Sequence, residues 1–289
     1  MRSDIFRIAE YARSQGLITA LATNGTLVTD DCAAAIAKAG IHRVSVSIDG
    51  ADALSHDGFR RFPGAFEAAW IGIERIKAEG IPFQVNTTVT KGNIGQLSEI
   101  LDLAVTKGAS ALHLFLLVPT GCGKEIAEDE MIDPIEYERV LNWIYDRSKD
   151  APIALKATCA PHYARIKQHR ARIEGTSTGT SDKASLDTMT KGCLAGSGVC
   201  FVSSCGEVYP CGYLPVSAGN IREDDIESIW NNSEVFKLLR DPNKLKGKCG
   251  RCGYRVICMG CRARAYGCSG DFLAEEPFCV YEPSRKDMR

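Results

Sequence analysis

Ten of the thirteen cysteines in this 289-residue chain lie between residues 193 and 279. They are Cys193, Cys200, Cys205, Cys211, Cys249, Cys252, Cys258, Cys261, Cys268 and Cys279. Thiols at about 11% of a segment either form disulfides or bind metal. The first residues, MRSDIFRIAEYARSQG, show no apolar secretion signal. We therefore expect a reducing, cytoplasmic compartment, in which metal binding is the favoured use of these thiols.

Two Cys-x2-Cys pairs, Cys249/Cys252 and Cys258/Cys261, are separated by only five residues. A zinc ribbon separates such pairs by about 15–20 residues, whereas iron–sulfur clusters use four thiolates with Cys-x2-Cys elements at varied spacings. Between residues 241 and 270, seven Lys and Arg stand against one acid. Cations offset the negative charge of a cluster held by thiolates. The pattern favours iron–sulfur binding, with zinc and unligated thiols as the alternatives.

The cysteine-poor part of the chain alternates between strand-like and helix-like stretches. Strands are predicted at 18–23, 43–49, 83–90 and 112–119, and helices at 1–15, 29–40, 64–80, 94–108 and 134–149. Gly40, Gly80 and Gly108 fall at helix ends, where a left-handed residue is favoured, and Thr29 and Asp133 are candidate N-caps. Strands that recur every 25 to 40 residues, roughly, are typical of βαβ units, so we expect an α/β fold with a parallel sheet.

Polar residues stand at the carboxyl ends of these strands, where parallel α/β folds bind ligands. They include Asn24, Ser47, Asp49 and Asn86. Taken singly, each could simply end a strand or cap the next helix. Ser47 and Asn86 lie inside their strands, however, and together the four ends predict a polar small-molecule site.

The overall composition excludes several function classes. The formal net charge is -1, which predicts no attraction to nucleic acid or to an anionic membrane. The longest stretches without a formal charge, 14–29 and 108–123, are 16 residues each and are too short to span a bilayer. We therefore expect neither nucleic acid nor membrane among the partners.

The full pattern resembles a known family. The body is similar to the later two-thirds of a radical S-adenosylmethionine (AdoMet) barrel, and the tail to its SPASM-type auxiliary-cluster domain. The resemblance rests on Cys193, Gly206-x4-Cys211, Cys249-x2-Cys252-x5-Cys258, Cys261 and Cys279. The segments YPCGYLP, CRARAYG and EEPFCVYEP are similar to the branch that acts on heme precursors. That branch includes AdoMet-dependent heme synthase (Fe-coproporphyrin decarboxylase) and the d1-heme biosynthesis proteins.

The resemblance implies the domain division and the cluster ligands. Residues 1–160 would form a partial radical SAM (β/α) barrel, 161–192 a linker, and 193–289 a SPASM-like iron–sulfur domain. An auxiliary [4Fe–4S] cluster would use Cys249, Cys252, Cys258 and Cys279. A possible second auxiliary [4Fe–4S] cluster would use Cys193, Cys200, Cys211 and Cys261. Cys205 and Cys268 fall outside both sets.

The chain departs from the family pattern in one respect. The family holds its reactive cluster with a CxxxCxxC motif and contacts AdoMet with a GGEP motif, and neither occurs in these 289 residues. In relatives, the segment after GGEP is similar to MRSDIFRIAEYA. We therefore expect that this chain begins too late, that the first barrel strands are missing, and that no residue present can start the radical reaction. The chain as given is predicted to be inactive.

The family chemistry is an oxidoreductase reaction. AdoMet is cleaved reductively to methionine and a 5′-deoxyadenosyl radical, and in heme synthase a porphyrin propionate then loses carbon dioxide and becomes vinyl. AdoMet would contact Asn24, Ser47, Asp49 and Asn86 in the full-length protein, and a tetrapyrrole substrate would contact Arg262 and Arg264. The electron donor would be a ferredoxin or flavodoxin. Two alternatives are a radical SAM/SPASM maturase that modifies a peptide and a non-catalytic iron–sulfur or zinc protein.

Overall fold

The computed structural model describes residues 2–175 and 191–284, which pack as two units. Unit 1 comprises the chain up to Phe115 together with Arg147–Lys156, and unit 2 comprises Leu116–Asp146 and the chain from Ala157 onward. Helix α9 (His162–Glu174) occupies the first part of the segment expected to be a linker. Residues 176–190 of that segment, where a flexible loop was expected, lie outside the described residues. The division at residues 160 and 192 stays a prediction.

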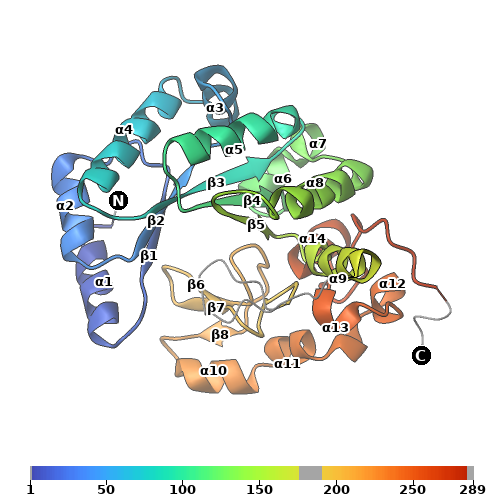
Figure 1. Ribbon diagram of the computed structural model, residues 1–289. Helices are drawn as coiled ribbons and strands as arrows, with labels where there is room; N and C mark the ends of the chain where they lie inside the picture. The colour runs from blue at the N-terminus through green and yellow to red at the C-terminus, as the bar shows by residue number, and fades with distance from the viewer. Residues whose placement is uncertain (1, 176–190, 285–289) are drawn as a thin grey trace. The chain divides into compact units, whose positions relative to one another are not determined.

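A five-stranded parallel sheet lies mainly in unit 1 (Figure 1). Its strands follow one another in chain order: β1 (Ala20–Thr23), β2 (Arg43–Ser47), β3 (Phe83–Val89), β4 (Ala111–Leu116) and β5 (Ala154–Thr158). The parallel register pairs Ala20 with Arg43 and Val44 with Phe83. The α/β fold class and the partial barrel are therefore confirmed. Within the described residues β1 is an edge strand, and the expectation that earlier strands are missing stays a prediction.

The helices of unit 1 follow the predicted pattern, with one addition. They are α1 (Ile5–Ser14), α2 (Asp30–Lys38), α3 (Ala53–Arg60), α4 (Ala65–Ala78), the short η1 (Ile94–Gln96) and α5 (Leu97–Thr106). Helices α2, α4 and α5 lie on one side of the sheet (Figure 1). Gly40, Gly80 and Gly108 have φ of 70°, 72° and 80°, as their positions at helix ends predict. The addition is α3, which lies between β2 and α4 and was not predicted.

Gly72 lacks a Cβ atom, which allows α4 to approach the loop after β1. A Cβ atom built on Gly72 would lie 2.2 Å from the carbonyl oxygen of Gly25. Gly72→Ala is therefore expected to destabilise the protein by about 1–3 kcal/mol, because backbone cannot move aside cheaply. Gly58 in α3 is the matched control, since a Cβ there meets nothing within 4 Å. Gly58→Ala should stabilise by about 0.5–1 kcal/mol. Urea unfolding of the two variants measures both changes in the free energy of unfolding. Equal changes would contradict the close approach of α4 to Gly25.

Unit 2 is built from short elements. Its first helices are α6 (Cys122–Glu125), α7 (Ala127–Glu130), α8 (Pro134–Arg147) and α9. A small antiparallel sheet follows, with strands β6 (Phe201–Val202), β7 (Glu207–Tyr209) and β8 (Gly219–Asn220). The last helices are α10 (Ile226–Asn232), α11 (Glu234–Arg240), η2 (Pro242–Lys244), α12 (Gly247–Gly250), α13 (Arg255–Cys258) and α14 (Arg262–Ser269). Small cores such as the cluster of Val208, Ile229 and Phe236 supply little burial, and such folds commonly rely on metal or disulfide cross-links.

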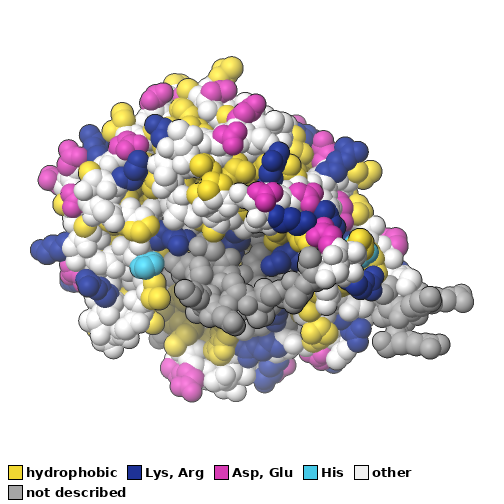
Figure 2. All heavy atoms as spheres, in the orientation of Figure 1, with side chains coloured by type: hydrophobic (Ala, Val, Ile, Leu, Met, Phe, Trp, Pro, Cys, Tyr) yellow, Lys and Arg dark blue, Asp and Glu magenta, His cyan; other side chains and the backbone are white. Residues whose placement is uncertain are grey.

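The surface of the described residues carries both signs of charge. Figure 2 shows Lys and Arg side chains interspersed with Asp and Glu on the face drawn, which agrees with the formal net charge of -1. No helix among the described residues is both long and apolar enough to cross a bilayer.

Candidate metal centre

One pocket in unit 2 is lined by all four cysteines that were predicted to hold the first cluster. These are Cys249, Cys252, Cys258 and Cys279. Helix α12 supplies Cys249, α13 ends at Cys258, and Cys279 comes from the last described segment. All four are free thiols. The structure therefore brings together side chains from two segments that are separated in the sequence by helix α14.

A single zinc ion and a four-iron cluster need their four thiolates at different spacings. Since each Zn–S bond is about 2.3 Å, the sulfurs of a tetrahedral zinc site stand about 3.8 Å apart. Among the described residues, no three His, Cys, Asp or Glu side chains are arranged so that they could hold one metal ion. A four-iron cluster binds each thiolate through a different iron, so its ligands stand farther apart. The four thiols lining one pocket fit that donor set.

Backbone N–H groups point at the sulfurs of this pocket. The N–H of Glu276 donates to Cys249 Sγ and the N–H of Tyr254 to Cys252 Sγ, each at 3.4 Å. Arg262 Nη2 lies 3.8 Å from Cys249 Sγ. Such donors stabilise thiolates and tune the reduction potential of iron–sulfur clusters. These N–H groups are thus placed to stabilise deprotonated sulfur.

Without metal, the thiols of Cys258 and Cys279 are neutral at ordinary pH, because the pKa of each is raised. Burial raises the pKa of Cys258, and the neighbouring Cys279 and Cys249 raise it further. Burial also raises the pKa of Cys279, to about 11, although the N–H of Tyr281 and the charge of Arg165 oppose the rise. Because metals bind thiolates, cluster assembly here must release protons.

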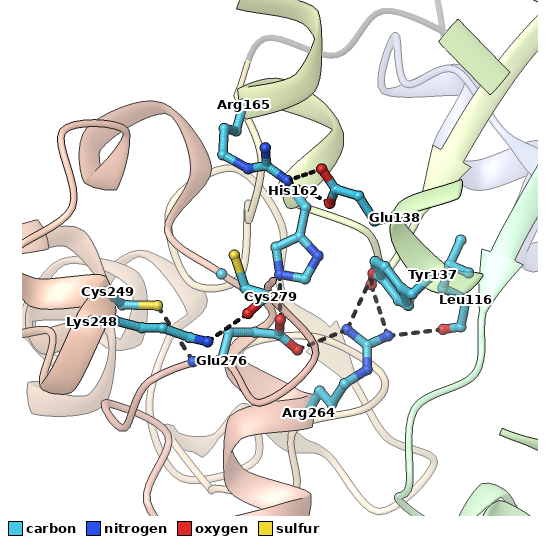
Figure 3. Close-up of polar contacts among 12 residues, drawn as sticks. Leu116, Tyr137, Glu138, His162, Arg165, Lys248, Cys249, Arg264, Glu276 and Cys279 are labelled. Carbon is cyan, nitrogen blue, oxygen red and sulfur yellow. Dashed lines mark hydrogen bonds and ion pairs between the residues drawn. The ribbon is translucent and has the colours of Figure 1, made fainter. Parts of the chain in front are cut away.

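A buried charge network stands beside the pocket (Figure 3). The carboxylate of Glu276, which is 0% exposed, contacts His162 Nε2 on one side and Arg264 Nη1 on the other, the latter at 3.2 Å. Burial favours the neutral acid, but His162 and Arg264 outweigh it and lower the pKa of Glu276 to about 2. Glu276 is therefore a charged group inside unit 2, adjacent to the cysteine segment.

Helix α9 contributes two residues to the pocket that sequence reasoning misses. His162 and Arg165 both line it, three positions apart on one helix face. Arg165 Nη2 donates to Glu138 Oε1 at 2.6 Å (Figure 3). The guanidinium of Arg165 also lies 5.2 Å from the ring centre of Tyr281. The three-residue spacing of His162 and Arg165 is compatible with one face of a helix. Because residues 161–192 were expected to form a linker, the sequence offered no reason to place these two side chains in a site.

The two arginines predicted to bind substrate are buried. Arg262 is 1% exposed and Arg264 0%. Arg262 donates to the carbonyl oxygens of Phe272 and Ala274, at 3.0 and 2.7 Å. Arg264 donates to three carbonyl oxygens, those of Leu116, Leu117 and Cys159, and to Tyr137 Oη, at 3.1–3.3 Å. Because these donors are already used inside unit 2, the placement does not support the predicted substrate contact and indicates a structural role.

The second predicted cysteine set is brought together only in part. Cys211 packs against the apolar cluster that contains the buried Cys261, and the N–H of Cys193 donates to the carbonyl oxygen of Cys258 at 3.0 Å. Burial raises the pKa of Cys211 to about 12, and the neighbouring Cys193 and Cys261 contribute to the rise. Cys200 is instead exposed, on the segment that leads into β6. Cys205 and Cys268, expected outside both sets, are exposed as well.

In unit 1, two of the predicted AdoMet contacts lie side by side. Ser47 pairs with Asn86 in the β2–β3 register, so both half-buried side chains stand on one face near the strand ends. Asn24 is exposed, and its Oδ1 accepts the N–H of Thr26 at 3.3 Å.

The fourth predicted AdoMet contact, Asp49, is enclosed within unit 1. Its side chain is 0% exposed, accepts the N–H of Thr88 at 2.7 Å and pairs with Arg60 Nε at 2.6 Å. The AdoMet contacts stay predictions, and Asp49 is already fully engaged by protein groups.

Comparison with known proteins agrees with this arrangement. The profile of the radical SAM superfamily matches residues 1–104, and that of SPASM, described as an iron–sulfur cluster-binding domain, matches residues 193–253. AdoMet-dependent heme synthase of Methanosarcina barkeri is 53% identical over 285 residues, which cover 99% of this chain and 80% of that protein. AdoMet-dependent heme synthase of Nitratidesulfovibrio vulgaris is 49% identical, with 99% and 77% covered.

A solved structure shares the fold. Streptococcus suis SuiB superposes with a TM-score of 0.71 at 18% identity, over 96% of this chain and 64% of SuiB. The chain therefore spans less than two-thirds of the length of SuiB. At this identity the likeness concerns the fold alone.

Proposed function

Because the chain belongs to the radical SAM superfamily and carries a SPASM iron–sulfur domain, we propose that it serves heme biosynthesis with a tetrapyrrole substrate. The observation that carries the proposal is the 53% identity to a heme synthase across 99% of the chain. That stretch includes both the strand ends of unit 1 and the cysteine pocket of unit 2. The relatives are named AdoMet-dependent heme synthases, and the proposed reaction class is oxidative decarboxylation of porphyrin propionates.

We assign the pocket cysteines Cys249, Cys252, Cys258 and Cys279 to one auxiliary [4Fe–4S] cluster, which supplies one-electron transfer when bound. The protein's own contribution is to orient and shield the thiolates. The N–H groups of Glu276 and Tyr254 fix two of the sulfurs, as described above. Lys248 Nζ donates to the carbonyl oxygen of Cys279 at 2.5 Å, which ties the last ligand to α12. A cation at this position also offsets the negative charge of the thiolates.

The strand ends of unit 1 are the proposed place for AdoMet. Ser47 and Asn86 offer a hydroxyl and an amide on one face, the kind of groups that bind a ribose or an amino-acid head. Asp49 is proposed to position the site without contacting AdoMet, because its carboxylate accepts the N–H of Thr88 and pairs with the guanidinium of Arg60. It thereby fixes the turn that follows β2 against the end of β3. A ferredoxin or flavodoxin remains the proposed electron donor.

The 289-residue chain is expected to form no 5′-deoxyadenosine from AdoMet, even with dithionite and a loaded auxiliary cluster. AdoMet binding needs an open iron, and a cluster held by four cysteines leaves none. A chain extended before Met1 by a barrel segment with CxxxCxxC should form 5′-deoxyadenosine and release carbon dioxide from Fe-coproporphyrin. Mass spectrometry of both products, per mole of protein, measures the difference.

Three outcomes separate the parts of this proposal. 5′-Deoxyadenosine from the 289-residue chain would show that three of its own cysteines can serve as the radical site. Cleavage by the extended chain without attack on Fe-coproporphyrin would keep the family chemistry and overturn the substrate. Cleavage together with decarboxylation supports both.

A further inference from the structure

A fourth thiol, that of Cys159, lies with the buried Cys261 and the half-buried Cys211 of the second set. Cys159 and Cys211 both pack against the apolar cluster that contains Cys261, Val118 and Leu214. Cys159 directly follows β5, far upstream of the cysteine-rich tail, and it belongs with the other three to unit 2. The N–H of Cys193 donates to the carbonyl oxygen of Cys258, three residues before Cys261, so Cys193 is held next to the segment that carries Cys261. Burial and the neighbouring Cys261, Cys211 and Cys193 all raise the pKa of Cys159.

The backbone holds Cys159 in an uncommon conformation. Its φ is 57°, one of three positive values among non-glycine residues in the described part of the chain. For a residue with a Cβ this conformation costs about 1–2 kcal/mol and persists only where the surroundings impose it. Here the carbonyl oxygen of Cys159 accepts from Arg264 Nη2 at 3.1 Å and from Tyr137 Oη at 3.2 Å. Such imposed strain is typical of ligand positions and other functional sites.

Backbone N–H groups favour the thiolate form of two thiols in this group. The N–H groups of Tyr213 and Leu214 lower the pKa of Cys211 against the effect of burial, and the N–H of Arg264 does the same for Cys261. Donors aimed at sulfur are what a thiolate-held cluster requires. Cys200, by contrast, is exposed.

We propose that Cys159, Cys193, Cys211 and Cys261 hold a second iron–sulfur cluster of the four-iron type, with Cys159 in the place that the sequence pattern assigns to Cys200. The inference rests on the proposed function, since it assumes that this SPASM-containing chain binds auxiliary clusters. With four thiolate ligands the cluster has no open iron, so it transfers electrons or supports the fold and does not bind AdoMet. Its ligands would join the end of β5 to three segments of the cysteine-rich tail.

Iron and sulfide analysis of the anaerobically reconstituted 289-residue chain tests the ligand set. Cys252→Ala removes the first cluster, and on this background about four irons per chain should remain. Adding Cys159→Ala should reduce them to less than one, whereas adding Cys200→Ala, the matched control, should leave about four. Mössbauer spectra of the ⁵⁷Fe-loaded variants identify the cluster type that remains.

A second variant separates ligation from folding. Asparagine tolerates the left-handed conformation better than alanine, so Cys159→Asn should keep the circular dichroism of the parent while losing the same irons. The proposal is overturned if Cys159→Asn retains these irons. It is also overturned if Cys200→Ala lowers the iron content while Cys159→Ala leaves it unchanged. If the wild-type chain binds about four irons and Cys252→Ala none, only the second cluster fails. If the wild-type chain binds no iron, the cluster assignment in the proposed function fails as well.

Discussion

Replacement of Arg264 by leucine is expected to destabilise unit 2 by about 3–5 kcal/mol, the usual cost of leaving a buried charge without its partner. The guanidinium is 0% exposed and is the cationic partner of Glu276, which is 0% exposed too. The change also leaves the carbonyl oxygens of Leu116 and Leu117 without this donor. Urea unfolding of cluster-free protein, followed by circular dichroism, measures the loss.

Two further variants make this result specific. Lys246→Leu breaks an ion pair with Asp271 whose lysine side chain is 62% exposed, and it should cost at most about 1 kcal/mol. The double variant Arg264→Leu/Glu276→Leu removes both buried charges and should recover part of the stability lost in the single variant. Equal losses for Lys246→Leu and Arg264→Leu would contradict the buried network.

Cys252→Ala is expected to lower the iron content of the anaerobically prepared wild-type chain by about four atoms, together with an equal amount of sulfide. The pocket lined by Cys249, Cys252, Cys258 and Cys279 would then offer three thiols, which leaves one iron without its thiolate and weakens the binding of the cluster. The measurement is iron, sulfide and zinc per chain, with the charge-transfer absorption of the cluster as a second readout.

Cys205→Ala is the matched control for this experiment. Cys205 is exposed and belongs to neither ligand set, so its replacement should leave iron unchanged. A full complement of iron in Cys252→Ala would contradict the ligand assignment. Stoichiometric zinc without iron in the wild-type chain would contradict the cluster itself.

Much of the fold follows from local signals, because a strand or helix is specified by residues near one another in the chain. The predicted strands at 18–23, 43–49, 83–90 and 112–119 each overlap an observed strand. The N-cap at Thr29 is confirmed by its Oγ1, which accepts the N–H of Cys32 at 3.2 Å. Strand β5, with the short sequence ALKAT, and helix α9 were missed. Their sequences carry weak periodicity, and packing of residues such as Tyr163 and Ile166 specifies α9.

The arginines beside Cys261 show where local reasoning ends. A charged residue next to a cysteine can face a ligand or the protein, and sequence alone does not distinguish the two. In the structure α14 is enclosed, with Ala263 and Ala265 at 3% and 0% exposure between and beside the two arginines. Both guanidinium groups therefore bind carbonyl oxygens within unit 2. The ion pair of Arg264 with Glu276, and that of Glu276 with His162, join segments that no short pattern connects.

The sequence by itself determined the kind of chemistry, because cysteine spacing and compartment limit the choice of metal. It also determined the parallel α/β body, because hydrophobic periodicity and helix caps specify its strands and helices. Only the tertiary structure decided which thiols meet. Cys200 is near Cys193 and Cys211 in the chain, yet it is exposed, whereas Cys159 comes from the end of a strand and packs with Cys211 and Cys261. The reason is that a pocket is formed by residues that fold together from distant segments, and the distance along the chain does not report the distance in space.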